Sequence, residues 1–109
     1  MKVNPSVISW NAPTTNTDGT EIQYEVNYLV GIGPSADTIE PLMTLPAQLQ
    51  EDGRFEAPIE LLALDNGEHF LALKAFAKED QDRMSEWSAP VQFAISEEIP
   101  DAPFGLQVS

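Results

Sequence analysis

The chain of 109 residues contains no cysteine, only five lysine and arginine residues, and a single histidine, His69. The lack of cysteine excludes disulfides, thiolate nucleophiles and cysteine-ligated zinc or iron–sulfur clusters. It leaves the compartment open, because a disulfide-free domain is compatible with oxidising and reducing surroundings. The few basic residues are scattered along the chain. We therefore expect neither nucleic acid nor an anionic membrane surface as a partner, since both need clustered lysine and arginine.

Long apolar runs are also missing. No window approaches 18 consecutive apolar residues, so the sequence predicts no membrane-spanning helix. The segment from Met1 to Pro5 has one lysine but no apolar stretch after it, and we expect no signal peptide there. Eighteen acidic residues against five basic ones give a net charge of −13. The simplest interpretation of this acidity is a solubilising surface.

What the sequence does contain is repeated alternation of apolar and polar residues. Hydrophobic residues make up 42% of the chain, which is enough for a packed core. Segments with period two are separated by proline, glycine, aspartate and asparagine, which is typical of an antiparallel β-sandwich. The strands that we expect cover residues 7–10, 22–30, 38–45, 55–64, 69–76 and 87–95.

Local composition refines several of these strands. Pro41 and Pro46 confine segment 38–45 to a sheet edge. Segment 69–76 is apolar on both faces, which favours a central strand. A helix over 55–64 is the main alternative there, and Pro58 argues against it.

Two further segments are expected to be loops. Residues 31–37 contain two glycines and a proline, which we expect to break the preceding strand. Residues 78–83 are charged, and we expect a solvated loop.

The order and spacing of several short motifs resemble a fibronectin type III domain of bacterial or phage type. The residues that carry this resemblance are Trp10 and Pro13, Tyr24, Val26 and Tyr28, Leu64 and Gly67, Ala75, and Ser85, Trp87, Ser88 and Pro90. The resemblance implies an all-β, immunoglobulin-like antiparallel β-sandwich with seven strands in two sheets. We expect its core to contain Trp10, Tyr24, Val26, Leu64, Leu71, Leu73 and Val91.

The resemblance also implies a function. It indicates a non-catalytic spacer or protein–protein interaction module of a modular bacterial or phage protein, with an extracellular or virion-associated location. The expected partners are other domains of the same array or other proteins. A carbohydrate-binding or adhesion module at a cell or virion surface is the alternative. Phe70, Phe76 and Phe104 are the aromatic residues that could stack on sugar rings.

His69 departs from the family pattern, which places a tyrosine at this corner. An imidazole N–H can donate to the same backbone acceptor that the tyrosine hydroxyl would bind. We therefore expect a structural role for His69, and a ligand role is the alternative.

The two ends of the chain depart from the family as well. Residues 1–6 are too short and polar for the family's first strand, whereas residues 100–109 resemble that strand. We therefore expect a domain at 1–97 that lacks its own first strand. Residues 98–109 would form a linker and a strand that starts a following domain, or a swapped or permuted first strand.

The tail suggests self-association. Phe104, Leu106 and Val108 form one apolar face of the expected strand and are candidate interaction residues. The last strand of the domain should end at the pole opposite to the one where the missing first strand begins. To fold back, the link from Ser96 to Ala102 would have to span the whole length of a strand. This link reaches at most about 23 Å, about the length of a seven-residue strand, so it would have to be fully stretched. We therefore expect the tail to pair with a second molecule rather than to fold back.

The sequence offers no catalytic, cofactor-binding or metal-binding residue that we would assign. Glu79, Asp80 and Asp82 place carboxylates as a calcium loop would, but the further ligands and the glycine of such a loop are missing. We keep these three residues as candidates for an interaction surface. Pairs of carboxylates occur only in charged loops, where neither is expected to be desolvated as acid–base catalysis requires.

Overall fold

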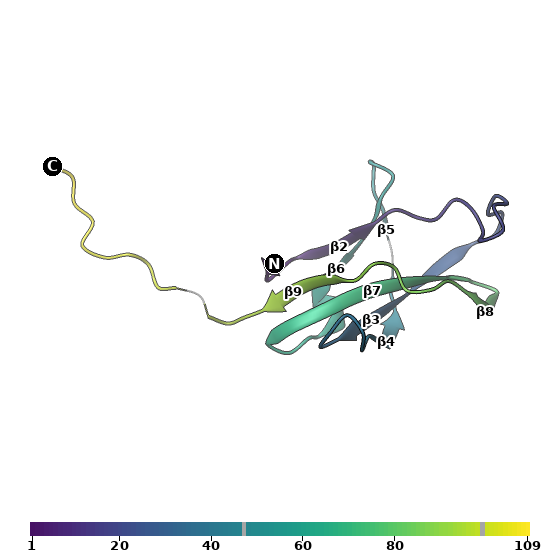
Figure 1. Cartoon of the computed structure of the whole chain (residues 1–109). Coiled ribbons are helices and arrows are strands. Elements are labelled where there is room, and N and C mark those ends of the chain that lie inside the picture. Colours follow the sequence, from purple (N-terminus) through teal and green to yellow (C-terminus); the bar gives the residue numbers. More distant parts are fainter. Residues whose placement is uncertain (47, 99) are drawn as a thin grey trace.

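The computed structural model describes residues 1–46, 48–98 and 100–109, and these residues are all-β with two sheets (Figure 1). The strands are β1 (Lys2–Val3), β2 (Val7–Trp10), β3 (Val26–Gly33), β4 (Glu40–Thr44), β5 (Gln48–Leu49), β6 (Phe55–Pro58), β7 (Gly67–Ala77), β8 (Asp80–Met84) and β9 (Val91–Ile95). One 3₁₀ helix, η1, covers Ile59–Leu62.

The two sheets form a β-sandwich-like arrangement. The larger sheet has the order β1-β9-β7-β3-β4, with β8 paired to β7, and the smaller has the order β2-β6-β5. Neighbouring strands are antiparallel except β1, which runs parallel to β9. The predicted edge position of segment 38–45 is confirmed by β4, and the predicted central position of segment 69–76 is confirmed by β7.

The glycines expected to end the strand at residue 31 lie inside β3, so that prediction is wrong. A Cβ on Gly31 would lie 2.7 Å from Ile39 Cγ2 and would also clash with the ring of Trp87. A Cβ on Gly33 would clash with the backbone of Thr38. Both glycines allow close approach of a covering segment, which is a recognised role of glycine within a strand.

Two other segments differ from their predictions. The expected strand over 55–64 ends at Pro58 and continues as the 3₁₀ helix η1, followed by Ala63 in the left-handed conformation at φ 49°. The expected loop over 78–83 is a turn at residues 78 and 79 followed by β8, which forms a hairpin with β7. β6 therefore ends where its pairing with β2 ends, and β8 forms because the end of β7 pairs with it.

The core lies between the two sheets. Its buried cluster includes Val30, which is 0% exposed, and the other members are Ile8, Leu45, Ala57, Ile59, Leu62, Leu71 and Phe93. Trp10, Leu64 and Leu73 pack against this cluster partly buried, and Leu71 is a member of it, so these four core predictions hold.

Three predicted core residues lie elsewhere. Tyr24 and Val26 are half-buried and line a cleft at one end of the sandwich. Tyr24 precedes β3, which begins only at Val26, so the expected strand over 22–30 starts four residues late. Val91 is 61% exposed, although its neighbour by alternation, Phe93, is buried.

The ends of the chain lie at the opposite pole from this cleft. Lys2 and Val3, within the segment expected to be too short and polar for the family's first strand, pair with Phe93 and Ala94. The Asn4 side chain then bonds both backbone groups of Ser96, at 2.9 Å and 2.8 Å. Residues 100–109 contain no strand and extend away from the sheets (Figure 1). Within the described residues, no helix has the length and apolar character needed to cross a membrane.

Candidate functional site

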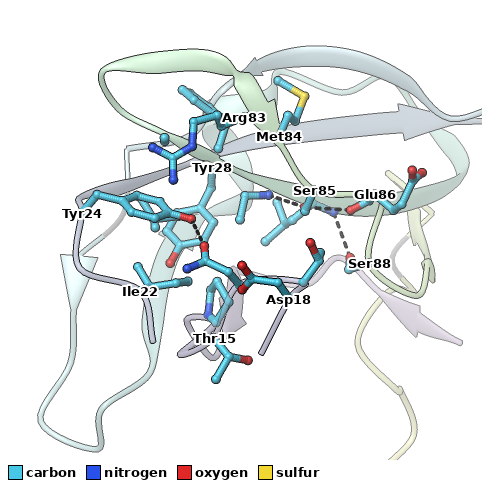
Figure 2. A pocket seen from close by; sticks show the side chains of 18 of the residues that line it. Thr15, Asp18, Ile22, Tyr24, Tyr28, Arg83, Met84, Ser85, Glu86 and Ser88 are labelled. Atoms are coloured by element: carbon cyan, nitrogen blue, oxygen red, sulfur yellow. Dashed lines mark hydrogen bonds between the residues drawn. The ribbon is translucent and has the colours of Figure 1, made fainter. Parts of the chain in front are cut away.

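A cleft lies at the end of the sandwich where β2 ends and β3 begins. It has a volume of about 750 Å³. The loop between β2 and β3 forms one wall, and the β7–β8 hairpin with the segment after it forms the other (Figure 2). Hydroxyl, amide and carboxylate groups line these walls above an aromatic floor.

Hydrogen bonds within the loop shape the first wall. The Thr20 N–H and hydroxyl both donate to Asp18 Oδ1, at 2.9 Å and 2.6 Å, and Asn16 Nδ2 donates to Thr20 Oγ1 at 3.1 Å. Gly19 completes the turn at φ 88°, a conformation that favours glycine. The bonds from the Thr20 hydroxyl and N–H hold the pKa of Asp18 below its ordinary value of 3.8. Asp18 therefore carries a negative charge at neutral pH.

The rings of Trp10 and Tyr28 form the floor of the cleft. Trp10 meets Tyr28 edge-to-face with ring centroids 5.1 Å apart, and it stacks on Phe55 at 6.1 Å. Tyr28 is buried, and this burial raises the pKa of its phenol. The Nε1 atom of Trp10 is buried, and its N–H lies close enough to the Tyr28 hydroxyl to lower the pKa of that phenol against the larger effect of burial, although no hydrogen bond of regular geometry joins the two among the described residues.

Tyr24 and Arg83 form one side of the cleft (Figure 2). The guanidinium of Arg83 lies 4.4 Å from the centroid of the Tyr24 ring, a cation–π contact. The Tyr24 hydroxyl donates to Oδ1 of Asn16, which joins this side to the loop. The contact with Tyr24 holds the positive charge of Arg83 at the rim.

Two serine hydroxyls fix the segment that follows the β7–β8 hairpin, in the same wall as Arg83. The backbone N–H of Ala75 donates to Ser85 Oγ at 2.9 Å, and that of Leu73 donates to Ser88 Oγ at 3.0 Å. The N–H groups of both serines donate back to the carbonyls of the same two residues, each at 2.8 Å. The serines of the Ser-x-Trp-Ser-x-Pro motif therefore bind this segment to β7 where no regular strand pairing exists.

Between these serines, Trp87 points to the outer face of the larger sheet. Its ring covers Gly31, and the Lys74 ammonium lies 4.7 Å from the ring centroid. Trp87 is thus committed to structure and does not line the cleft.

The charge of the cleft is negative. Asp18, Asp82 and Glu86 line it with one opposing cation, Arg83, and all four side chains are exposed. None of these carboxylates is desolvated as a general acid requires. The arrangement can bind a neutral or cationic group against an aromatic surface.

The structure separates the six candidate interaction residues. Asp82 lines the cleft, whereas Glu79 and Asp80 lie at the turn of the β7–β8 hairpin. Asp80 Oδ1 accepts from the backbone N–H of Asp82 at 3.1 Å, and the described residues contain no group of acidic or histidine side chains placed to hold a metal ion. Phe104, Leu106 and Val108 are 97%, 93% and 97% exposed, in the tail that extends away from the sheets (Figure 1), and none of them lines the cleft.

The predicted roles of His69 and of the exposed aromatics can be compared with their positions. His69 Nε2 lies 2.7 Å from the carbonyl oxygen of Asp65, so the imidazole donates to a backbone acceptor as predicted. Phe76 is only 5% exposed and Phe70 is half-buried, so the prediction that Phe76 could stack on sugar rings is wrong. Phe76 lies where β7 pairs with both β3 and β8, and its small exposed part lines the cleft.

Sequence reasoning missed the cleft itself. The period-two pattern assigned Tyr24 to the core, and nothing in the sequence places Arg83 beside it. The polar turn residues 14–20, directly before an aromatic segment, were the available signal. Comparisons with family models, with curated proteins and with solved structures found no match for this chain.

Proposed function

We propose that this chain is a fibronectin type III-like module, an immunoglobulin-like sandwich whose seven principal strands are those of four residues or more. The two-sheet arrangement, the packing of Trp10 against the core and the His69 corner bond support this proposal. Its role is that of a spacer or protein–protein interaction module of a modular bacterial or phage protein, and it is not an enzyme.

The observation that carries the binding role is the aromatic-floored cleft at the loop end. The rings of Trp10 and Tyr28 line its floor, and hydrogen bonds hold both walls in place. Preorganised walls reduce the ordering cost of binding. The exposed carboxylates give the cleft a negative potential. None of them is desolvated as a catalytic acid would be, so the cleft is suited to binding rather than to catalysis.

The favoured ligand is a peptide segment of a partner protein that carries a lysine or arginine. Its cation would face Asp18, Asp82 and Glu86, and its apolar part would lie on the aromatic floor. The net charge of −13 disfavours anionic ligands throughout the surface.

A displayed library of short peptides, selected against the full chain, tests this function. We expect enrichment of peptides with lysine or arginine, and binding that shifts the NMR signal of the Trp10 indole N–H. Glu86→Lys should weaken binding about tenfold, the size of one lost charge pair. Glu79→Lys, the same charge change at the hairpin turn, should leave binding unchanged.

Equal weakening by both variants would show that only total charge matters, and absence of any selected peptide would argue against a peptide cleft. The carbohydrate-binding alternative draws support from the aromatic floor beneath the amide of Asn16 and the hydroxyls of Thr15 and Thr20. A glycan array distinguishes the two. Saturable binding of a glycan on the array, together with a shift of the Trp10 indole NMR signal when the same glycan is added in solution, would favour the alternative.

A further inference from the structure

Strand β2 has an unpaired edge. Among the described residues it pairs only with β6 and stands at the end of its sheet. The Ile59 N–H donates to the Ser6 carbonyl at 3.0 Å, which sets the alternation of the ladder. Because hydrogen-bonded and non-hydrogen-bonded pairs alternate in an antiparallel ladder, the N–H and C=O groups of Val7 and Ser9 point away from β6. These groups can receive another strand.

Exposed apolar side chains lie next to this edge. Only Asn4 to Ser6 connect β1, at the end of one sheet, to β2, at the end of the other, so the two open edges are adjacent. On β9, next to β1, Val91 pairs with the core residue Leu71, yet it is 61% exposed. Val3 and Val7 are 53% and 50% exposed. Val91 faces the opposite sheet but is not covered by it. We infer that the smaller sheet lacks a strand at this place.

The tail has the pattern of a strand that would fit there. Phe104, Leu106 and Val108 alternate with Gly105 and Gln107, so an extended tail presents one apolar face. All three apolar side chains are more than nine-tenths exposed. The tail, which would donate a strand, and the region beside β2, which would accept it, therefore both expose apolar side chains.

We propose that residues 104–108 of one copy add as a strand to the open edge of β2 in a second copy. The Val7 and Ser9 backbone groups bond to the added strand, and its apolar face covers Val91. Each copy carries one donor and one acceptor, so the exchange builds a closed ring or an open chain of copies.

The course of the tail favours a second copy over the tail's own domain. The radius of gyration of 18.0 Å exceeds the value of about 13 Å for a compact chain of this length, because the tail leaves the sandwich at Ser96 (Figure 1). Since β2 has four residues and is about 13 Å long, the reach of the link does not by itself prevent folding back, contrary to the prediction from a seven-residue strand. Antiparallel folding back would need a chain reversal near Ala102, whereas the tail extends away from the sheets (Figure 1).

Sedimentation velocity of the full chain from micromolar to millimolar concentration tests the proposal. We expect concentration-dependent association that strengthens at high salt, because the copies repel through their net charge of −13. Leu106→Lys should raise the dissociation constant about tenfold or more, since it removes a buried leucine from the interface. Gln107→Lys is the matched control, because it adds the same charge on the other face of the strand, and it should change the constant little.

Hydrogen exchange identifies the acceptor. The amides of Val7 and Ser9 should be protected only at concentrations where the chain associates. A chain that stays monomeric throughout overturns the proposal, and protection of these amides in the monomer would show that the tail covers its own edge. Equal weakening by both variants, or association without protection of these amides, would also overturn it.

Discussion

The two ends of the sandwich differ in whether their polar groups are hydrogen-bonded and their apolar side chains are covered. At the cleft end, polar groups are paired within the chain: Asp18 accepts from Thr20, and Ser85 and Ser88 accept from the backbone of β7. At the tail end, Asn4 and Ser96 pair, but the apolar side chains around them stay exposed.

This difference indicates which kind of ligand each end is suited to bind. Paired polar groups above aromatic rings form a preformed surface for a polar ligand, and binding there costs little ordering. Unpaired backbone and exposed apolar surface instead favour another strand. The predictions below test this contrast, beginning with the largest expected effect.

Replacement of Trp10 tests how far the cleft end depends on its aromatic floor. Trp10→Ala should lower the free energy of unfolding by about 3–5 kcal/mol, the range for removal of a large packed aromatic side chain. The loss follows from its contacts with Tyr28 and Phe55 and with the buried cluster. Urea unfolding followed by circular dichroism measures it, and a cost below about 1 kcal/mol would show that Trp10 contributes little to the core.

Removal of the Ser88 hydroxyl tests the serine wall. Ser88→Ala deprives the Leu73 N–H of its acceptor and should cost about 1 kcal/mol, the net value of one hydrogen bond. Ser9→Ala is the control, since the Ser9 hydroxyl accepts only a 3.3 Å bond from Arg54 among the described residues. Urea unfolding of both variants is the measurement, and equal costs would contradict a special role for the motif serine.

Truncation of Val91 tests the tail end. At low concentration, Val91→Ala should change stability by less than about 0.5 kcal/mol, as expected for an exposed side chain. Phe93→Ala, two residues along the same face, should cost about 3–5 kcal/mol because Phe93 is buried. Thermal unfolding compares the two variants, and a large cost for Val91→Ala in the monomer would mean that its face is already covered.

Local sequence predicted several elements correctly because the signal was itself local. Pro41 restricts β4 to an edge, and apolar residues on both faces place β7 in the centre. The carbonyl that accepts from His69 belongs to Asp65, four residues earlier in the chain, so that bond could be anticipated. Trp10 was also predicted to pack in the core.

The errors occurred where a distant segment decided the outcome. Gly31 looked like a strand breaker, but it lies in β3 because Trp87 needs the space of a side chain above it. Segment 78–83 looked like a loop, but it forms β8 because β7 extends far enough to pair with it. Arg83 and Tyr24 meet only through this hairpin, so the candidate cleft could not be predicted.

The sequence by itself determined the all-β class, the strongly acidic surface and the apolar alternation of the tail, since these depend on composition and on the period of neighbouring residues. Only the tertiary structure decided which inward-facing residues are covered. Val91 and Phe93 have the same alternation on the same strand, yet one is exposed and the other is buried. The physical reason is that burial depends on what the opposite sheet places above a residue, and the opposite sheet ends at β2.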